Sequence, residues 1–201
     1  MSHPSADETM RLRAKQILCA GGVVILPTDT VYGIGAHPNF PAAVDRICRI
    51  KGRPSEKPIA LLASDPDAVE QFGAGLPPAA ARLAARFWPG ALTLVLPCRG
   101  GWEGFRVPAH DGTRQLIRIC GGVLRVTSAN LSGQMPACSA AETLRSIGQE
   151  ADLIIDGGIS PGGVASTVVK VAPENELTLL REGAIPREAI FAVAVGKRPC
   201  E

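Results

Sequence analysis

The chain has 201 residues, of which 46% are hydrophobic and 20% are charged, and its formal net charge is +2. This length and apolar content predict a globular protein with a buried core, and so small a net charge does not by itself indicate a nucleic-acid-binding protein. No apolar run reaches the ~18 residues of a spanning helix, and the polar N-terminus does not resemble a signal peptide. We therefore expect a soluble cytoplasmic protein with no membrane partner.

The cysteines and histidines make a metal site improbable on sequence grounds. The six cysteines are scattered without a C-x-x-C pair, and there are three histidines. This pattern is typical of small buried thiols rather than of disulfides or a zinc site. We expect no metal held by protein ligands.

Apolar residues at helical spacing predict helices, and short apolar or β-branched runs predict strands. Helices are expected over 9–20, around 44–48, from Asp65, over 76–87, from Asp111 to 120 with Asp111 as its cap, and over 139–147, where Ser139 and Glu142 have capping-box spacing. Strands are expected over 23–26, 58–63, 91–96, 105–108, 123–126, 153–155, 166–171 and 177–181, with a glycine-rich surface loop over 97–104. The mixed order predicts an α/β fold, a twisted mixed sheet flanked by helices. We expect a single domain over 1–190 and a C-terminal tail over 191–201.

A dense polar motif follows the first strand, with the sequence Pro27-Thr28-Asp29-Thr30-Val31-Tyr32-Gly33-Ile34-Gly35. In α/β folds, ligands usually bind in loops beyond the carboxyl ends of strands. A plain turn also uses Pro, Asp and Gly, so this motif alone leaves both interpretations open. A loop of similar design over 127–133 offers the hydroxyls of Ser128 and Ser132 and the amide of Asn130, which can bind phosphate, ribose or a carboxylate.

Three cations, Lys51, Arg53 and Lys57, lie within seven residues where glycine and proline end a helix. Arginine offers a planar fork for phosphate oxygens and lysine a point charge, so the cluster suits a polyanion, although a solvated surface loop would look the same. The chain contains neither G-x-S-x-G nor a G-x-x-x-x-G-K-[ST] phosphate loop. Positioning and charge stabilisation are therefore the expected means of catalysis.

Taken together, these stretches resemble the YrdC-like L-threonylcarbamoyladenylate synthases, in their short, single-domain bacterial form. The matching motifs fall in the family's order and cover nearly the whole chain. They are Pro27-Thr28-Asp29-Thr30-Val31-Tyr32-Gly33, Lys51-Gly52-Arg53-Pro54, Lys57-Pro58, Trp88-Pro89-Gly90-Ala91-Leu92-Thr93, Arg106-Val107-Pro108, Thr127-Ser128-Ala129-Asn130-Leu131-Ser132-Gly133, Asp156-Gly157-Gly158, Ser166-Thr167-Val168-Val169 and Leu180-Arg181-Glu182-Gly183.

The resemblance implies a sheet curved around a positively charged cavity, and an enzyme that joins L-threonine, bicarbonate and ATP into threonylcarbamoyl-AMP with release of pyrophosphate. It implies Mg²⁺ brought in with ATP. The ATP-binding residues it implies are Lys51, Arg53, Ser128, Asn130 and Arg181, of which Lys51 and Arg53 are the expected catalytic residues. The threonine-binding residues it implies are Thr28, Thr30, Tyr32, Arg106 and Ser166, with Arg106 opposite the carboxylate.

The implied product serves the N6-threonylcarbamoyladenosine modification of tRNA, so the resemblance suggests tRNA or double-stranded RNA and downstream threonylcarbamoyl-transfer proteins as partners. Longer members of the family are expected to have a histidine where this chain has Leu62, and often have a basic residue where it has Gln134. The resemblance therefore does not establish the substrate contacts of these two positions. Two alternatives remain: an RNA-binding module of the same fold without adenylation, and a related carbamoyl-adenylating enzyme with another substrate. Asp29 has no assigned role.

Overall fold

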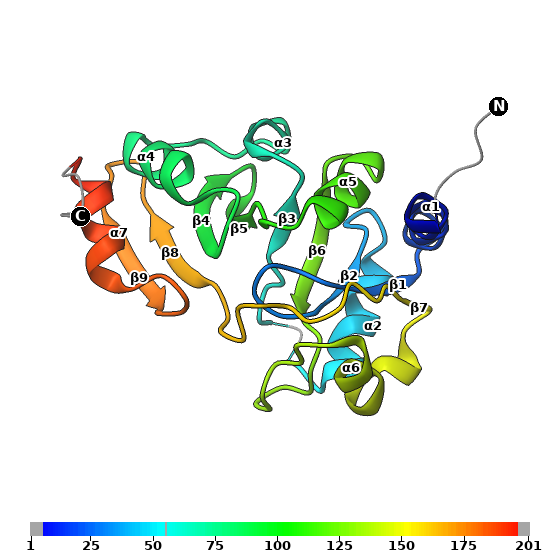
Figure 1. Cartoon of the computed structure of the whole chain (residues 1–201). Helices are drawn as coiled ribbons and strands as arrows, with labels where there is room; N and C mark the ends of the chain where they lie inside the picture. The colour runs from blue at the N-terminus through cyan, green and yellow to red at the C-terminus, as the bar shows by residue number, and fades with distance from the viewer. Residues whose placement is uncertain (1–5, 55, 197–201) are drawn as a thin grey trace.

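The computed structural model describes residues 6–54 and 56–196, and within them the chain forms one nine-stranded mixed sheet in the order β7-β1-β2-β6-β3-β5-β4-β8-β9 (Figure 1). The strands are β1 (Val23–Leu26), β2 (Gly33–Ala36), β3 (Leu61–Ala63), β4 (Leu92–Cys98), β5 (Gly101–Arg106), β6 (Val123–Ser128), β7 (Leu153–Ile154), β8 (Thr167–Val171) and β9 (Leu177–Arg181). Strands β1 and β7, β3 and β5, and β4 and β8 pair in parallel, and the other neighbours pair antiparallel. The prediction of a mixed α/β sheet is confirmed.

The helices cover the sheet unevenly, and α1 and α7 lie at opposite ends of the molecule (Figure 1). Their bounds are α1 (Ala6–Cys19), α2 (Pro41–Lys51), α3 (Pro66–Gln71), α4 (Pro78–Phe87), α5 (Asp111–Ile119), α6 (Ala140–Ser146) and α7 (Arg187–Ala194), with a 3₁₀ turn, η1 (Gly148–Glu150). None of the helices in the described part of the chain combines the length and apolar character that crossing a membrane requires.

Strand β1 is covered on both faces. Its alternate residues Val23 and Ile25 pack in a core with α2, whereas Val24 and Leu26 pack with α1 and α5. All four side chains are fully buried. A strand between two layers reads as a continuous apolar run, which explains why the sequence predicted it correctly.

Strand β4 is covered on one face only. Leu92, Leu94 and Leu96 point into a core with α4 and α7, and alternate with Thr93 and Val95, which face a cavity. Successive side chains of a strand point to opposite faces, so the missing helical layer leaves this second face of the sheet open. That open face is where the candidate site lies.

The glycines of the opening motif serve strand packing. The structure places Gly33 in β2, which pairs with both β1 and β6, although the sequence suggested a loop through this stretch. A Cβ on Gly33 would lie 2.6 Å from a methyl carbon of Val126, and one on Gly35 2.9 Å from the other. Glycine therefore allows the β2 backbone to approach β6 closely.

Two local predictions are wrong, and one helix was missed. The expected loop over 97–104 is instead a β4–β5 hairpin, because cross-strand pairing outweighs the weak strand propensity of glycine. Helix α5 has His110 rather than Asp111 as its N-cap, since the His110 ring accepts a hydrogen bond from the Thr113 amide. Helix α7 was not predicted at all.

Helix α7 extends to Ala194, and its Val193 and Ala194 are buried against α4. The boundary expected at residue 190 therefore falls inside a helix, and residues 197–201 lie outside the described part of the chain. The expectation of buried thiols is confirmed for Cys48 and Cys120 and is wrong for Cys19, which is exposed.

Candidate functional site

A cavity of about 790 Å³ opens on the uncovered face of the sheet. Its walls come from the loop between β1 and β2, the chain over 57–60, and strands β4, β5, β6, β8 and β9. The segment between β7 and β8 runs across the sheet from its β7 edge toward β8 (Figure 1), and its residues Ala165 and Ser166 line the cavity. The volume of the cavity falls within the usual range for small-molecule sites.

The hydroxyl of Thr28 organises the loop between β1 and β2. Thr28 Oγ1 donates a hydrogen bond to the carbonyl of Val31 at 2.6 Å and accepts bonds from the amides of Thr30 and Val31. This is a local side-chain turn of the kind that threonine favours. The hydroxyls of Thr28 and Thr30 also lie 3.0 Å apart, so both are preorganised at the cavity wall.

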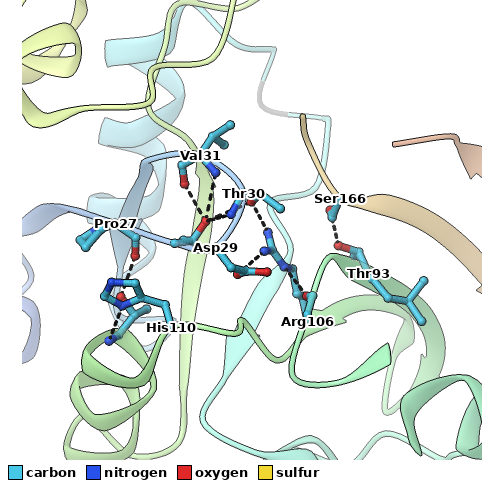
Figure 2. Close-up of polar contacts among 12 residues, drawn as sticks. Pro27, Asp29, Thr30, Val31, Thr93, Arg106, His110 and Ser166 are labelled. Carbon is cyan, nitrogen blue, oxygen red and sulfur yellow. Dashed lines mark hydrogen bonds and ion pairs between the residues drawn. The ribbon is translucent and has the colours of Figure 1, made fainter. Parts of the chain in front are cut away.

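Arg106, at the end of β5, is the best-anchored cation of the cavity. Its Nε donates to the carbonyl of Gly90 at 2.9 Å, Nη1 to Thr30 Oγ1 at 2.8 Å, and Nη2 to Asp29 Oδ1 at 2.5 Å (Figure 2). Burial lowers the pKa of Arg106, and the neighbouring Asp29 carboxylate opposes that shift. The guanidinium is therefore held in one orientation beside a counter-ion.

Ser166, just before β8, connects the two ends of the cavity. Its hydroxyl lies 2.8 Å from Thr93 Oγ1 and accepts a hydrogen bond from Arg181 Nη2 at 3.2 Å. Arg181 also donates to the Ser166 carbonyl through Nε and Nη2. The β8–β9 pair thus places Ser166 and Arg181 together, although the resemblance assigned the serine to threonine and the arginine to ATP.

Arg53 and Arg181 supply positive charge without a carboxylate partner. Arg53 donates to the carbonyls of Lys57 at 3.3 Å and Pro58 at 3.0 Å, and within the described residues neither arginine forms an ion pair. Burial, followed by the nearby charge of Arg53, lowers the pKa of Arg181. Two arginines that repel one another across a cavity are suited to an anionic ligand.

Lys51 lies behind the cavity rather than in its wall. It is 2% exposed, and its Nζ donates to the carbonyls of Ser128 and Asn130, in the second case at 2.6 Å. Burial and then repulsion from Arg53 lower the pKa of Lys51 to about 8. The lysine therefore holds both Ser128, the last residue of β6, which lines the cavity, and Asn130 in the loop that follows.

Asn130 and Tyr32 shape the same region. The Asn130 amide group donates to the carbonyls of Leu131 and Gln134, and its Oδ1, buried, has no hydrogen-bond partner within the described residues. Tyr32 is fully buried, and its hydroxyl donates to the Gly158 carbonyl at 2.7 Å. Both residues fix loops at the edge of the cavity.

Sequence reasoning gave no substrate-site role to four residues of this region. Glu103 and Arg125 form a half-buried bidentate ion pair, and Arg125 also donates to the Ile59 carbonyl. Trp102 lies in the cavity wall with Lys170 Nζ 3.8 Å above its ring. Asp29 is the fourth. Its place within a dense polar motif was the available signal, whereas nothing in the sequence links Glu103 to Arg125.

The structure brings most of the predicted residues to one place. Thr28, Thr30, Tyr32, Arg53, Arg106, Ser128, Ser166 and Arg181 line the cavity. Lys51 and Asn130 stand behind it and contact the backbone that does. Of the residues expected to bind threonine, Thr30 contacts Arg106 and Thr28 lies beside Thr30, whereas Ser166 is hydrogen-bonded to Arg181, which was expected to bind ATP.

Comparisons with known proteins agree with this geometry. The Sua5/YciO/YrdC family model, described as "Telomere recombination", matches residues 16–183. A protein of Bacillus subtilis named threonylcarbamoyl-AMP synthase is 37% identical over 200 residues, which cover 94% of this chain and 58% of the relative. A protein of Pyrococcus abyssi with the same name is 38% identical over 183 residues, covering 86% and 54%.

A solved structure supports the same relationship. The crystal structure of P. abyssi Sua5 complexed with L-threonine matches with a TM-score of 0.87 at 33% identity, over 97% of this chain and 59% of that one. The chain thus spans a little over half the length of these relatives. Because the match extends over most of this chain in sequence and fold alike, the protein belongs to the Sua5/YciO/YrdC family.

Proposed function

We propose that this protein is an enzyme that condenses L-threonine, bicarbonate and ATP into threonylcarbamoyl-AMP and pyrophosphate. The observation that carries the proposal is one cavity that joins an oriented arginine fork, Arg106, to the uncompensated cations Arg53 and Arg181. The first suits a carboxylate and the second suits a polyphosphate. The names of the relatives and the threonine bound to one of them support the same assignment.

Threonine is proposed to bind at the Arg106 end. After its three protein contacts, the guanidinium retains one N–H on each terminal nitrogen, and these two donors are left for a carboxylate. Thr28, Thr30 and Ser166 place hydroxyls around it. Leu62, at the position where a histidine was expected, adds an apolar wall that suits the substrate's methyl group.

ATP is proposed to bind toward Arg53 and Arg181, with Ser128 beside them. To reach a phosphate, Arg53 exchanges its bonds to the Lys57 and Pro58 carbonyls for charge-assisted bonds to phosphate oxygens, which are the stronger kind. Lys51 and Asn130 serve this end by holding the loop that carries Ser128. Tyr32 plays the corresponding part for the loop over 156–158.

The chemistry needs no protein nucleophile. The threonine ammonium loses a proton to solvent, and the neutral amine attacks the bicarbonate carbon, expelling hydroxide as water to leave a carbamate. A carbamate oxygen then forms a bond to the α-phosphorus, and the bond from that phosphorus to the bridging oxygen of pyrophosphate breaks. The protein's contribution is positioning of the two substrates and stabilisation of the charge on the leaving group.

Mg²⁺ is proposed to arrive with ATP, where it neutralises charge on the phosphates. The carboxylates beside the cavity do not form a metal cage, because Asp29 pairs with Arg106 and Glu103 pairs with Arg125. The donor set of the protein thus leaves the metal to phosphate oxygens and water. The product would pass to proteins that transfer the threonylcarbamoyl group to tRNA.

The test is pyrophosphate release from ATP and Mg²⁺ by the purified protein, with L-threonine and bicarbonate omitted one at a time. Release is expected only when both are present, together with a product of the mass of threonylcarbamoyl-AMP. Release that ignores threonine would contradict the substrate assignment and favour another acceptor. No release, combined with salt-sensitive tRNA binding, would favour the RNA-binding alternative.

A further inference from the structure

Asp29 contacts Arg106 but is not itself among the described residues that line the cavity. The two side chains form an ion pair in which Arg106 is 8% exposed and Asp29 14% exposed. Figure 2 shows the carboxylate directed at the guanidinium from the loop between β1 and β2. The aspartate therefore reaches the cavity only through the arginine.

The contacts around Arg106 fix the plane of its guanidinium. Gly90, Thr30 and Asp29 each accept one hydrogen bond from a different nitrogen of the group. Gly90 lies before β4 and the other two acceptors lie after β1, so the planar group is held between two segments far apart in sequence. Of these acceptors Asp29 is the charged one, and charge-assisted bonds are roughly twice as strong as neutral ones.

Asp29 is itself held from two sides. The Thr28 turn fixes the backbone around it, as described above. On the other side, the segment between β7 and β8 packs on the loop between β1 and β2, since the Gly163 amide donates to the Thr30 carbonyl at 2.9 Å. A Cβ on Gly162 would lie 2.8 Å from the Asp29 carbonyl oxygen, so glycine permits this contact. The carboxylate thus has a rigid base from which to orient another group.

The charge balance gives the arrangement a testable sign. Arg106 and Asp29 together carry no net charge, whereas Arg106 alone would carry +1 in a buried setting. If attraction of an anion were the only requirement, removal of Asp29 would strengthen carboxylate binding. If orientation is required, the same removal weakens it, because a misplaced fork loses its bidentate geometry.

We propose that Asp29 is a positioning residue that orients the Arg106 guanidinium toward the substrate's carboxylate. The inference rests on the proposed function in taking that carboxylate to be the one of L-threonine. Asp29 itself does not contact the substrate. Its ion pair with Arg106 preorganises the end of the cavity that binds the amino acid.

The first experiment measures L-threonine and ATP binding by calorimetry for wild type and Asp29→Asn. The matched control is Asp111→Asn, which removes an exposed aspartate that also pairs with an arginine, Arg114, outside the cavity wall. Asp29→Asn is expected to weaken threonine binding about 10- to 100-fold and to leave ATP binding within about twofold. Tighter or unchanged threonine binding would overturn the proposal, as would an equal loss of both ligands.

The second experiment adds an NMR measurement on the wild type, which depends neither on substrate nor on the folding of Asp29→Asn, and a binding measurement on Asp29→Glu. In the wild-type protein, NMR of the arginine side chains should resolve separate Nη resonances for Arg106, because its hydrogen bonds to Thr30 and Asp29 hinder rotation of both terminal groups. Asp29→Glu, which keeps the charge, is expected to recover part of the threonine affinity lost in Asp29→Asn. Freely rotating Nη groups in the wild type would overturn the proposal.

The two hypotheses fail in different ways. If the wild-type protein binds no threonine yet shows hindered Arg106 rotation that is lost in Asp29→Asn, the proposed function fails and the orienting role of Asp29 stands for another carboxylate. If the wild type binds threonine and Asp29→Asn binds it equally well, the proposed function stands and the role of Asp29 fails.

Discussion

The two ends of the cavity treat positive charge in opposite ways. At one end, Arg106 is paired with Asp29 and fixed by three hydrogen bonds. At the other end, Arg53 is bound to backbone carbonyls and Arg181 to Ser166, and neither has a carboxylate partner among the described residues. The first is the neutral end, named after its ion pair, and the second is the positive end, although the charge of Arg181 also acts on Arg106.

This difference matches the needs of two unlike anions. A single carboxylate carries one charge, so recognition depends on the geometry of a fork more than on the amount of charge. A triphosphate carries several charges spread over many oxygens, and it requires net positive potential that several side chains can share. A protein that binds both in one cavity therefore benefits from pairing one arginine with a carboxylate and leaving the other arginines without one.

The largest expected effect comes from removing a cation from the positive end of the cavity. Arg53→Ala should lower kcat/KM for ATP by about 10²- to 10³-fold, because it removes charge stabilisation of the leaving pyrophosphate, whereas threonine binding should change little. Steady-state pyrophosphate release at varied ATP measures this. Arg49→Ala removes an exposed arginine from the preceding helix turn and serves as the control. Equal losses in the two variants would contradict the assignment of Arg53.

An intermediate effect concerns Lys51, the buried cation behind the positive end. Its pKa is about 8 in the folded protein, against 10.5 ordinarily, so between these values the unfolded chain binds more protons. The free energy of unfolding of the wild type should therefore rise with pH, relative to Lys51→Met, by about 1–2 kcal/mol from pH 8 to 9.5.

Urea unfolding at several pH values measures that difference. The exposed Lys15, replaced by Met, is the control, and its difference from wild type should not vary over the same range. A wild-type minus Lys51→Met difference that is constant with pH would show that Lys51 is not the titrating group that burial implies.

The smallest effect concerns the neutral end, where His110 lies close to Asp29. Its Nδ1 accepts from the Thr113 amide at 3.1 Å at the start of α5, and burial lowers its pKa below 6.5, with Asp29 and Asp111 opposing. Because the folded pKa is depressed, the stabilising contribution is complete above pH 6.5 and is lost as pH falls through the folded value.

His110→Asn keeps an N-cap acceptor but does not titrate in this range. It should reduce the loss of stability on acidification by about 1 kcal/mol or less, measured as thermal unfolding from pH 7.5 to 5. An acid dependence identical to that of the wild type would contradict this role. A change in threonine affinity at pH 7.5 would show that His110 contributes to the neutral end directly.

Elements that depend on neighbouring residues could be predicted from the sequence, and elements that depend on pairing with another strand could not. The apolar run of β1, covered on both faces, and the capping residues Ser139 and Glu142 of α6 could be read directly. The hairpin strand β5 could not, because Gly101 and Gly104 have low strand propensity and are ordered by pairing with β4. The N-cap role of His110 was missed for a different reason. The interaction is local, but aspartate is the commoner capping residue, so the sequence favoured Asp111.

For the site, the sequence determined which residues carry groups able to bind an anionic ligand. The hydroxyls of Thr28 and Ser166 and the cations Arg53, Arg106 and Arg181 all lie in the cavity wall. Their meeting at one cavity follows in part from chain position, since Arg106, Ser166 and Arg181 sit where a strand begins or ends, and such positions converge at one edge of an α/β sheet.

Only the tertiary structure decided how each cation is used. Three arginines and a lysine look alike in the sequence. Within the described residues, however, Arg106 has a buried counter-ion, Arg53 and Arg181 have none, and Lys51 donates to backbone carbonyls. The reason is that the charge environment of a side chain depends on groups distant in the chain: 77 residues separate Arg106 from Asp29, and 79 separate Lys51 from Asn130. Residue type fixes the charge, and folding fixes its partner.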